Sequence, residues 1–142
     1  MNKPFKIVQA DWDEQREQLL AIRYKVFVAE QGVPEELEVD EYDSSALHLL
    51  ALGESQQAIG TARLLPDGHI GRMAVSLEYR GQGVGSALLR HLIGLSQQAG
   101  HRQATLNAQC SAEDFYLQAG FIPVGEVFED AGIPHRKMIC RC

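Results

Sequence analysis

A glycine-rich segment joins a run of residues with strand character to a run with helix character, and it constrains the fold more than any other part of the chain. The segment reads Arg80-Gly81-Gln82-Gly83-Val84-Gly85-Ser86; an apolar run, 69–77, precedes it and an amphipathic run, 83–98, follows it. Glycine permits backbone angles that other residues avoid, and the first amides of a helix have no partner within the helix. Together these features predict a cradle for an anion such as a diphosphate.

Two common phosphate loops do not fit this segment. A P-loop ends in Gly-Lys-Ser or Gly-Lys-Thr, a sequence that the chain lacks. The dinucleotide fingerprint spaces its glycines as G-x-G-x-x-G and needs an acidic residue about 20 positions further on. Here the spacing is G-x-G-x-G, and residues 101–106 include no acid. A different phosphate loop and a tight turn that binds no ligand remain as alternatives.

The pattern R-x-x-G-x-G resembles the acetyl-CoA loop of the GNAT acetyltransferase superfamily, and a second motif strengthens the resemblance. Tyr116-x-x-x-Gly120-Phe121 is similar to the signature that follows this loop in the superfamily. Segments 23–31 and 128–135 also resemble one bacterial branch of small proteins, so the resemblance covers nearly the whole chain. It implies a single acetyltransferase domain over residues 1–142. The implied fold is α/β, with a GNAT-like mixed sheet of antiparallel N-terminal strands and a parallel central pair, flanked by helices.

The hydrophobic pattern agrees with this fold class. Alternating or continuous apolar runs predict strands at 5–9, 47–52, 58–65, 69–77 and 104–109. Helical periodicity predicts helices at 12–30, 83–98 and 111–119, and Gly32 and Pro34 should end the first of them. The segment Cys140-x-Cys142 should end a final strand.

Composition narrows the classes of function. A chain of 142 residues, 45% hydrophobic and with a formal net charge of -6, fits one compact domain and argues against a nucleic-acid partner. It has no long apolar run and no secretory signal, so we expect a cytoplasmic protein without membrane association. The odd cysteine count argues against a disulfide framework, and the scattered histidines predict no metal site. A homodimer through an exposed strand edge stays open.

The resemblance implies which residues bind acetyl-CoA, the cosubstrate. The main chain of Met73, Ala74 and Val75 would pair with the pantetheine arm, and the Val75 amide could face the thioester oxygen. The diphosphate would lie on Arg80, Gly81, Gln82, Gly83, Val84, Gly85 and Ser86. Many superfamily members have Asn at the position of Gln109, so a pantetheine contact there is in question and Asn107 is the candidate substitute.

Acetyl transfer requires a base for the amine, a donor for the oxyanion and an acid for the thiolate. Tyr116 is the predicted acid; donation from a phenol of pKa ~10 to a thiolate of pKa ~8.5 costs about 2 kcal/mol. For the base, Glu30 could serve if partial burial raised its pKa, and His48 or His135 could serve near neutrality. Cys110, which precedes a candidate helix cap at Ser111, offers an alternative route through an acetylated thiol.

Acidic residues gather between positions 30 and 43, without any Lys or Arg: Glu30, Glu35, Glu36, Glu38, Asp40, Glu41 and Asp43. If this segment borders the pocket, its field favours a cationic amine; otherwise it is a solvated surface. Glu30 and His135 are the candidate acceptor-binding residues. The sequence thus predicts an N-acetyltransferase that acts directly on a primary amine of a small cationic molecule. The alternative is a non-catalytic CoA-binding sensor or protein-interaction module.

Overall fold

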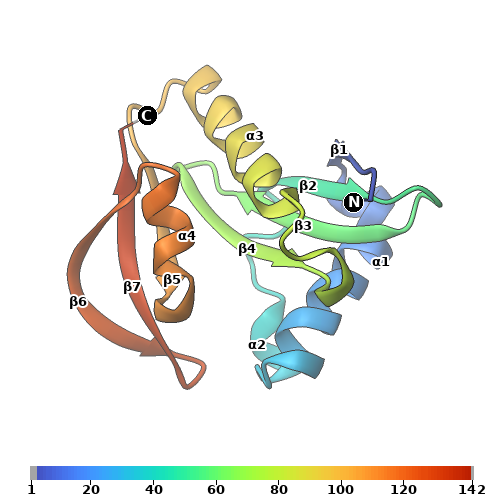
Figure 1. Ribbon diagram of the computed structural model, residues 1–142, viewed down its shortest axis with the longest axis horizontal. Coiled ribbons are helices and arrows are strands. Elements are labelled where there is room, and N and C mark those ends of the chain that lie inside the picture. The colour runs from blue at the N-terminus through green and yellow to red at the C-terminus, as the bar shows by residue number, and fades with distance from the viewer. Residues whose placement is uncertain (1–2, 142) are drawn as a thin grey trace.

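A computed structural model describes residues 3–141, apart from the side chain at position 37. Over this range seven strands form one mixed sheet in the order β1-β2-β3-β4-β5-β7-β6 (Figure 1). The strands are Lys6–Ala10 (β1), Leu47–Leu52 (β2), Ala58–Leu64 (β3), His69–Val75 (β4), Ala104–Gln109 (β5), Ile122–Asp130 (β6) and Ile133–Cys140 (β7). β4 and β5 are parallel, and the other neighbours are antiparallel. The predicted fold class is confirmed.

Helices cover both faces of the sheet. They are α1 (Trp12–Arg23), α2 (Glu35–Glu38), α3 (Val84–Gln98) and α4 (Glu113–Gln118), with a π-helix η1 (Tyr24–Glu30) and the 3-10 turns η2 (Leu77–Tyr79) and η3 (Cys110–Ala112). Successive strand residues point to opposite faces. Leu49 accordingly packs in the core with Leu88 of α3, whereas Leu50 packs in a second core with Leu19 of α1. No helix within the described residues is both long and apolar enough to cross a membrane.

The predicted helix 12–30 is α-helical only as far as Arg23. Asp11 begins it by accepting hydrogen bonds from the amides of Asp13 and Glu14. From Tyr24 the chain continues as a π-helix, and the amide of Gln31 donates to the carbonyl of Val26 five residues back. Such wide turns are rare in proteins, and those that occur are often found at functional sites. This one carries Glu30 to the end of β4, as described below.

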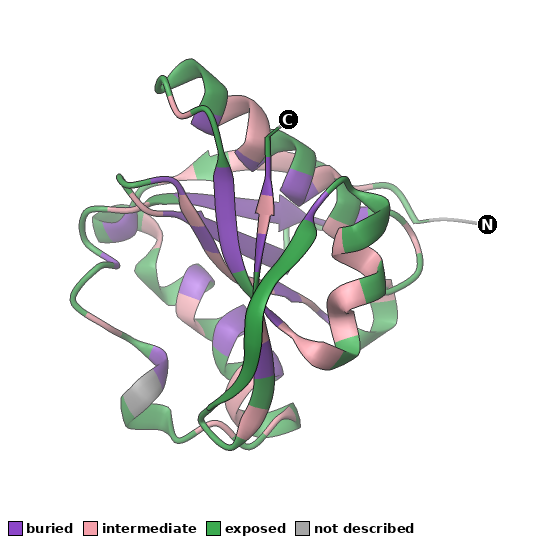
Figure 2. Cartoon of the chain, turned by 90° about the vertical axis from the view of Figure 1, so that its left-hand side faces the viewer, coloured by how far each residue is buried: buried purple, intermediate pink, exposed green. Residues whose placement is uncertain are grey.

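The C-terminal residues form a hairpin that the sequence did not predict. His135, the candidate base and acceptor-binding residue, lies in β7, opposite Gln109 of β5. Its partner strand β6 is exposed along its whole length (Figure 2). Ser111 was expected to cap α4, but no side chain caps that helix. β7 ends at Cys140, which is disulfide-bonded although the odd cysteine count did not lead us to expect it; Cys142 lies outside the described residues.

β4 leaves its parallel neighbour after two residues. The two strands pair at His69 with Thr105 and at Ile70 with Leu106, and then they diverge. On the other side of β4 the register with β3 shifts between Thr61 and Arg63, which marks a β-bulge. Arg72, at this bulge, has a φ of 49°, a left-handed conformation that few non-glycine residues adopt. The divergence opens the middle of the sheet.

Candidate active site

Two cavities meet at the divergent end of β4. The first has a volume of about 400 Å³ and is lined by the end of β4, the glycine loop and the aromatic face of α4. Of the residues predicted to bind acetyl-CoA, it brings together Met73, Ala74, Val75, Arg80, Gly81, Gly83, Val84, Gly85, Ser86 and Tyr116. Gln82 does not line it; its side chain donates to the carbonyl of Glu78 and accepts from the amide of Lys3. Asn107 lines the second cavity instead.

The glycine loop has the geometry of an anion cradle. Gly81 and Gly83 have φ values of 75° and 88°, and Gly83 is the N-cap of α3 without any side-chain cap. A Cβ atom built on either glycine would meet no protein atom within 4 Å, so these positions are glycine for their backbone angle and for the open space beside them. The first amides of α3 have no acceptor within the helix. The residues present therefore fit a diphosphate.

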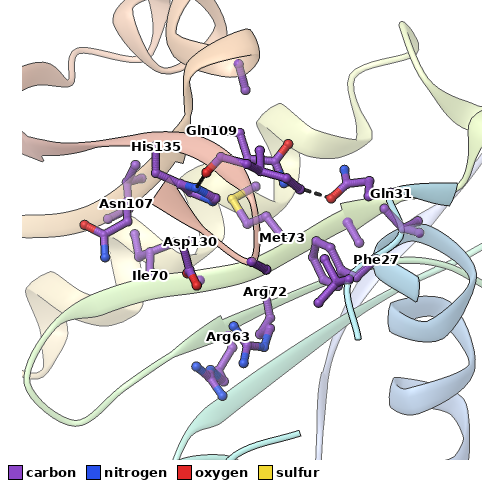
Figure 3. A pocket seen from close by; sticks show the side chains of 18 of the residues that line it. Phe27, Gln31, Arg63, Ile70, Arg72, Met73, Asn107, Gln109, Asp130 and His135 are labelled. Atoms are coloured by element: carbon purple, nitrogen blue, oxygen red, sulfur yellow. Dashed lines mark hydrogen bonds between the residues drawn. The ribbon is translucent and has the colours of Figure 1, made fainter. Parts of the chain in front are cut away.

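The second cavity, of about 420 Å³, lies between β4, β5, η1 and the end of the β6–β7 hairpin (Figure 3). It shares Met73, Ala74, Val75, Arg80, Ala112 and Tyr116 with the first cavity. Its remaining wall includes side chains that the sequence did not single out, among them Phe27, Gln31, Arg72 and Asp130. Gln109 donates a hydrogen bond of 2.8 Å to Gln31, which joins β5 to the end of η1 across this wall. Because the two cavities share part of their walls, a ligand in one cavity could touch a ligand in the other.

Val75 presents its backbone amide to this junction. The amide of Ser76 donates to the carbonyl of Ile59 on β3, at 2.8 Å. Since N–H groups of neighbouring strand residues point to opposite edges, the N–H of Val75 points into the gap beside β5. The carbonyl of Val75 accepts a hydrogen bond of 2.9 Å from Nε of Arg80. This leaves the amide as a donor for an oxyanion.

Tyr116 stands where the two cavities meet. Its hydroxyl donates to Sδ of Met73 at 3.6 Å, and its ring makes edge contacts with Phe115 and Phe121. Burial raises the pKa of the Tyr116 phenol to about 12. The group is therefore fully protonated at neutral pH, but it is a weaker acid than the sequence-based comparison with an ordinary phenol assumed.

Glu30 is placed beside the glycine loop, but not as a partly buried base. Its two carboxylate oxygens accept from Nη1 and Nη2 of Arg80 at 2.6 and 2.7 Å, and its side chain is 40% exposed. The hydrogen bonds from Arg80 lower the pKa of Glu30. The raised pKa on which its role as a base depended is thus wrong in direction. The pair instead holds the end of η1 against the loop.

Of the two histidines considered as the base, the structure places only His135 at the cavities. His48 is buried under the ring of Trp12 and bonds the carbonyl of Asp43, and it lines neither cavity. His135 does line the second cavity and is 8% exposed. Its Nδ1 bonds the carbonyl of Ile133 at 2.7 Å and its ring stacks on Phe128. Cys110 lines neither cavity. His135 is thus the one of these three candidates that the fold brings to the site.

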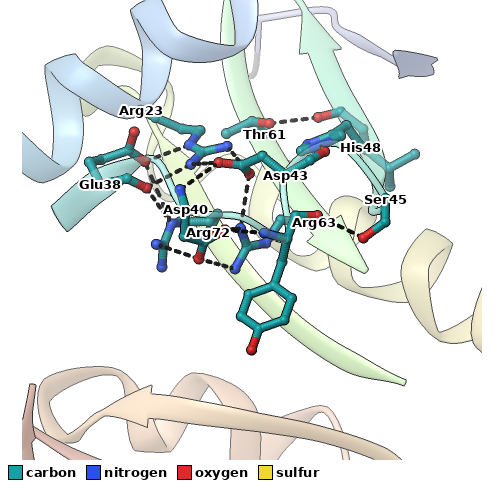
Figure 4. A network of polar contacts seen from close by, with 11 residues as sticks. Arg23, Glu38, Asp40, Asp43, Ser45, His48, Thr61, Arg63 and Arg72 are labelled. Atoms are coloured by element: carbon teal, nitrogen blue, oxygen red, sulfur yellow. Dashed lines mark hydrogen bonds and ion pairs between the residues drawn. The ribbon is translucent and has the colours of Figure 1, made fainter. Parts of the chain in front are cut away.

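Three carboxylates of the acidic segment, those of Glu38, Asp40 and Asp43, are paired with arginines (Figure 4). Asp43 accepts hydrogen bonds from Arg23 and Arg63, and these guanidinium groups hold its pKa down at about 2. The remaining links of the cluster join Arg23 to Glu38, Arg63 to Asp40, and Arg72 to Glu38 and Asp40. The expected negative field of this segment on the pocket is therefore wrong for its inner carboxylates. No local pattern of the sequence pairs these arginines with acids up to 34 residues away.

Known proteins share both the sequence and the architecture. Residues 10–142 match the family model described as an acetyltransferase (GNAT) domain. The chain is 34% identical over 138 residues to the uncharacterized N-acetyltransferase YjcF of Bacillus subtilis, covering 94% of this chain and 98% of that one. Two crystal structures resemble the fold: Escherichia coli ElaA (TM-score 0.84, 31% identity, 96% and 99% of the two chains) and an acyl-CoA N-acyltransferase from Pseudomonas aeruginosa (TM-score 0.85, 29% identity, 96% and 99%). This chain belongs to the GNAT acetyltransferase family.

Proposed function

We propose that this protein transfers the acetyl group of acetyl-CoA directly to the primary amine of a small molecule. One observation carries the proposal: the two cavities share the end of β4 and Tyr116, so a thioester from one side and an amine from the other would meet there. Members of the GNAT family use acetyl-CoA, and the glycine loop with its uncapped helix N-terminus fits the diphosphate.

The reaction needs four events at this junction. The amine nitrogen attacks the thioester carbon, and the amide of Val75 donates to the oxygen that becomes negative. The C–S bond then breaks, and the phenol of Tyr116 gives its proton to the departing thiolate and recovers one from solvent. Before the attack a base takes one proton from an acceptor that arrives as an ammonium ion, and the nitrogen loses a second proton to solvent after the attack. The product is the N-acetylated amine and free CoA.

We assign the base to His135 rather than to Glu30. Because Nδ1 of His135 donates to a carbonyl, the neutral ring carries its lone pair on Nε2, which is available to accept a proton. Glu30 is engaged by Arg80, and its lowered pKa makes it a poor proton acceptor. We assign Glu30 the role of holding η1, and so the acceptor-side wall, in place.

The acceptor was expected to be cationic because of the acidic segment. In the structure, most of these acidic residues lie outside the cavity wall or form ion pairs. A different carboxylate, Asp130 at the end of β6, is exposed and points into the second cavity (Figure 3). It supports a preference for an acceptor that arrives as an ammonium ion.

The test is a thiol-release screen. The protein, saturated with acetyl-CoA, is mixed with primary amines, and free CoA is followed together with the mass of the acetylated product. Amine-dependent release that falls in a His135→Gln variant, with acetyl-CoA binding kept, supports the proposal. Binding of acetyl-CoA without release on any amine would favour the sensor alternative.

A further inference from the structure

Arg72 is the arginine of the buried ion-pair cluster that reaches the acceptor cavity with an accessible side chain. Its side chain is 26% exposed, against 0% for Arg23 and 6% for Arg63. It lines the second cavity from the β-bulge of β4, where its φ is 49°. A left-handed conformation strains a non-glycine residue, and such strain clusters at functional positions. The bulge thus directs this guanidinium to the cavity at a cost in stability.

Two carboxylates of the cluster are buried, and the third, Asp40, is 28% exposed but lies outside the cavity lining. Asp43 is 1% exposed and accepts from Arg23, from Arg63 and from the amide of Asp40. Glu38 lines the cavity but its side chain is 6% exposed and accepts from Arg23. Asp40 does not line the cavity. An amine in the cavity would therefore find the arginine side of this cluster.

The surroundings of Arg72 favour additional negative charge. Burial lowers the pKa of Arg72, and the neighbouring Arg63 and Arg23 lower it further, more than Asp40 and Glu38 raise it. Arg63 also lines the cavity, and its Nε is buried without a hydrogen-bond partner among the described residues. A buried donor without an acceptor is costly. An anion in the cavity beside Arg72 would therefore lie near the positive charge of Arg63 as well.

We propose that the acceptor carries an anionic group in addition to its amine, and that Arg72 binds this group. The inference rests on the proposed acetyl transfer and names its substrate class: amines with a carboxylate or a phosphate. The amine would lie toward Val75, where the thioester is expected, with Asp130 of the same cavity as its counterion. Arg72 and Val75 are three residues apart on β4, a separation of at most roughly 10 Å because the bulge at Arg72 shortens the extended chain. The distance between the amine and the anionic group of the acceptor is therefore varied in the experiment.

The experiment compares matched acceptors with the full chain and acetyl-CoA. α-Amino acids and ω-amino carboxylates of increasing length are set against their carboxamides, and aminoalkyl phosphates against the corresponding amino alcohols. We expect kcat/KM to favour the anionic member by about tenfold or more, because charge-assisted hydrogen bonds to a guanidinium are strong. Carboxylate and phosphate arms show which group the site takes. Equal or better turnover of the uncharged members would overturn the proposal while leaving acetyl transfer intact.

Variants connect the preference to Arg72. In Arg72→Gln the ratio of kcat/KM between anionic and uncharged acceptors should fall about tenfold, and Arg72→Lys should lie between because it keeps the charge but not the planar fork. Arg90→Gln is the matched control, since it removes the same charge from an exposed position on α3 that lines neither cavity. Acetyl-CoA binding by calorimetry verifies that each variant is folded. An unchanged ratio in Arg72→Gln contradicts the assignment.

A binding measurement separates this inference from the proposed function. If no amine releases CoA, acetyl transfer fails, and the anion site is then judged by calorimetry on the CoA-loaded protein. N-Acetylated ω-amino carboxylates should bind more tightly than their carboxamides, and Arg72→Gln should remove the difference. Equal binding of the two ligands in the wild-type protein would refute the site on its own.

Discussion

Replacing Tyr116 with Phe should remove catalysis while leaving the fold and cofactor binding intact. The hydroxyl donates to a thioether, which is a weak acceptor, at 3.6 Å. The ring contacts with Phe115 and Phe121 do not need the hydroxyl. We therefore expect Tyr116→Phe to change the free energy of unfolding by about 1 kcal/mol or less.

The effect on rate follows from the pKa of the phenol. With the pKa of Tyr116 at about 12 and that of a thiol near 8.5, full proton transfer to the thiolate is uphill by about 5 kcal/mol. A kcat of about 10 per second corresponds to a barrier of about 16 kcal/mol, so this step fits within the barrier of an ordinary enzyme. General acids contribute about 100-fold or more. We expect kcat to fall at least about 100-fold in the variant.

Single-turnover thiol release, acetyl-CoA calorimetry and thermal unfolding together decide the outcome. Tyr24→Phe is the matched control, since Tyr24 is 48% exposed and lines neither cavity. Because the pKa of Tyr116 is raised, its titration should not lower kcat in the wild-type protein between pH 7 and about 10. A variant that keeps kcat within about threefold of wild type would refute the assignment of Tyr116 as the acid.

Three further results are expected. Asp43→Asn should lower the free energy of unfolding by about 3 kcal/mol in urea, since it leaves buried arginines without a partner. Because the pKa of Asp43 is lowered in the folded state from 3.8 to about 2, the wild-type protein has this stabilisation above about pH 4 and loses it as the pH falls toward 2; an identical acid dependence in the variant would contradict this. Gly83→Ala should weaken acetyl-CoA binding by about tenfold, because φ there is 88°, whereas Gly94→Ala in the interior of α3 should bind as wild type does; equal affinities would remove the loop from the site. Arg80→Ala should weaken acetyl-CoA binding most at low ionic strength, and a loss independent of salt would argue that Arg80 acts only through Glu30 and Val75.

Local sequence patterns predicted most element bounds, and the family resemblance implied the parallel central pair of the sheet. The nearly continuous apolar run at 47–52 and the glycine turn before α3 are strong signals, and both elements lie within a residue or two of their expected ends. The β6–β7 hairpin was missed because β6 is exposed along its whole length and so lacks the usual apolar alternation; only a final strand near Cys140 was expected. The π-helix could not be told from an α-helix in the sequence, because its residues continue the same helical pattern of apolar residues.

The cofactor side of the site was predictable and the acceptor side was not. A cofactor loop is contiguous in sequence, so its residues were named together. The acceptor cavity joins residues far apart in the chain: Gln31 bonds Gln109, and Arg72 joins Glu38 and Asp40. Such pairings depend on tertiary contacts that a single sequence does not reveal. The ion pairs that neutralise Glu38, Asp40 and Asp43 could not be predicted for the same reason, because composition gives the number of charges but not which charges are paired.

The early divergence of β4 from β5 means that this protein carries an unpaired strand edge inside its own sheet. Amide hydrogens at such an edge exchange with solvent far faster than those of a paired ladder. The Val75 amide should therefore exchange early in the free protein, although Ile70 on the same strand is paired and should exchange late. A ligand in the gap would slow the exchange of the Val75 amide and leave the exchange of the Ile70 amide unchanged. Deuterium uptake along seven residues of one strand would then report whether the site is filled, without any knowledge of the acceptor.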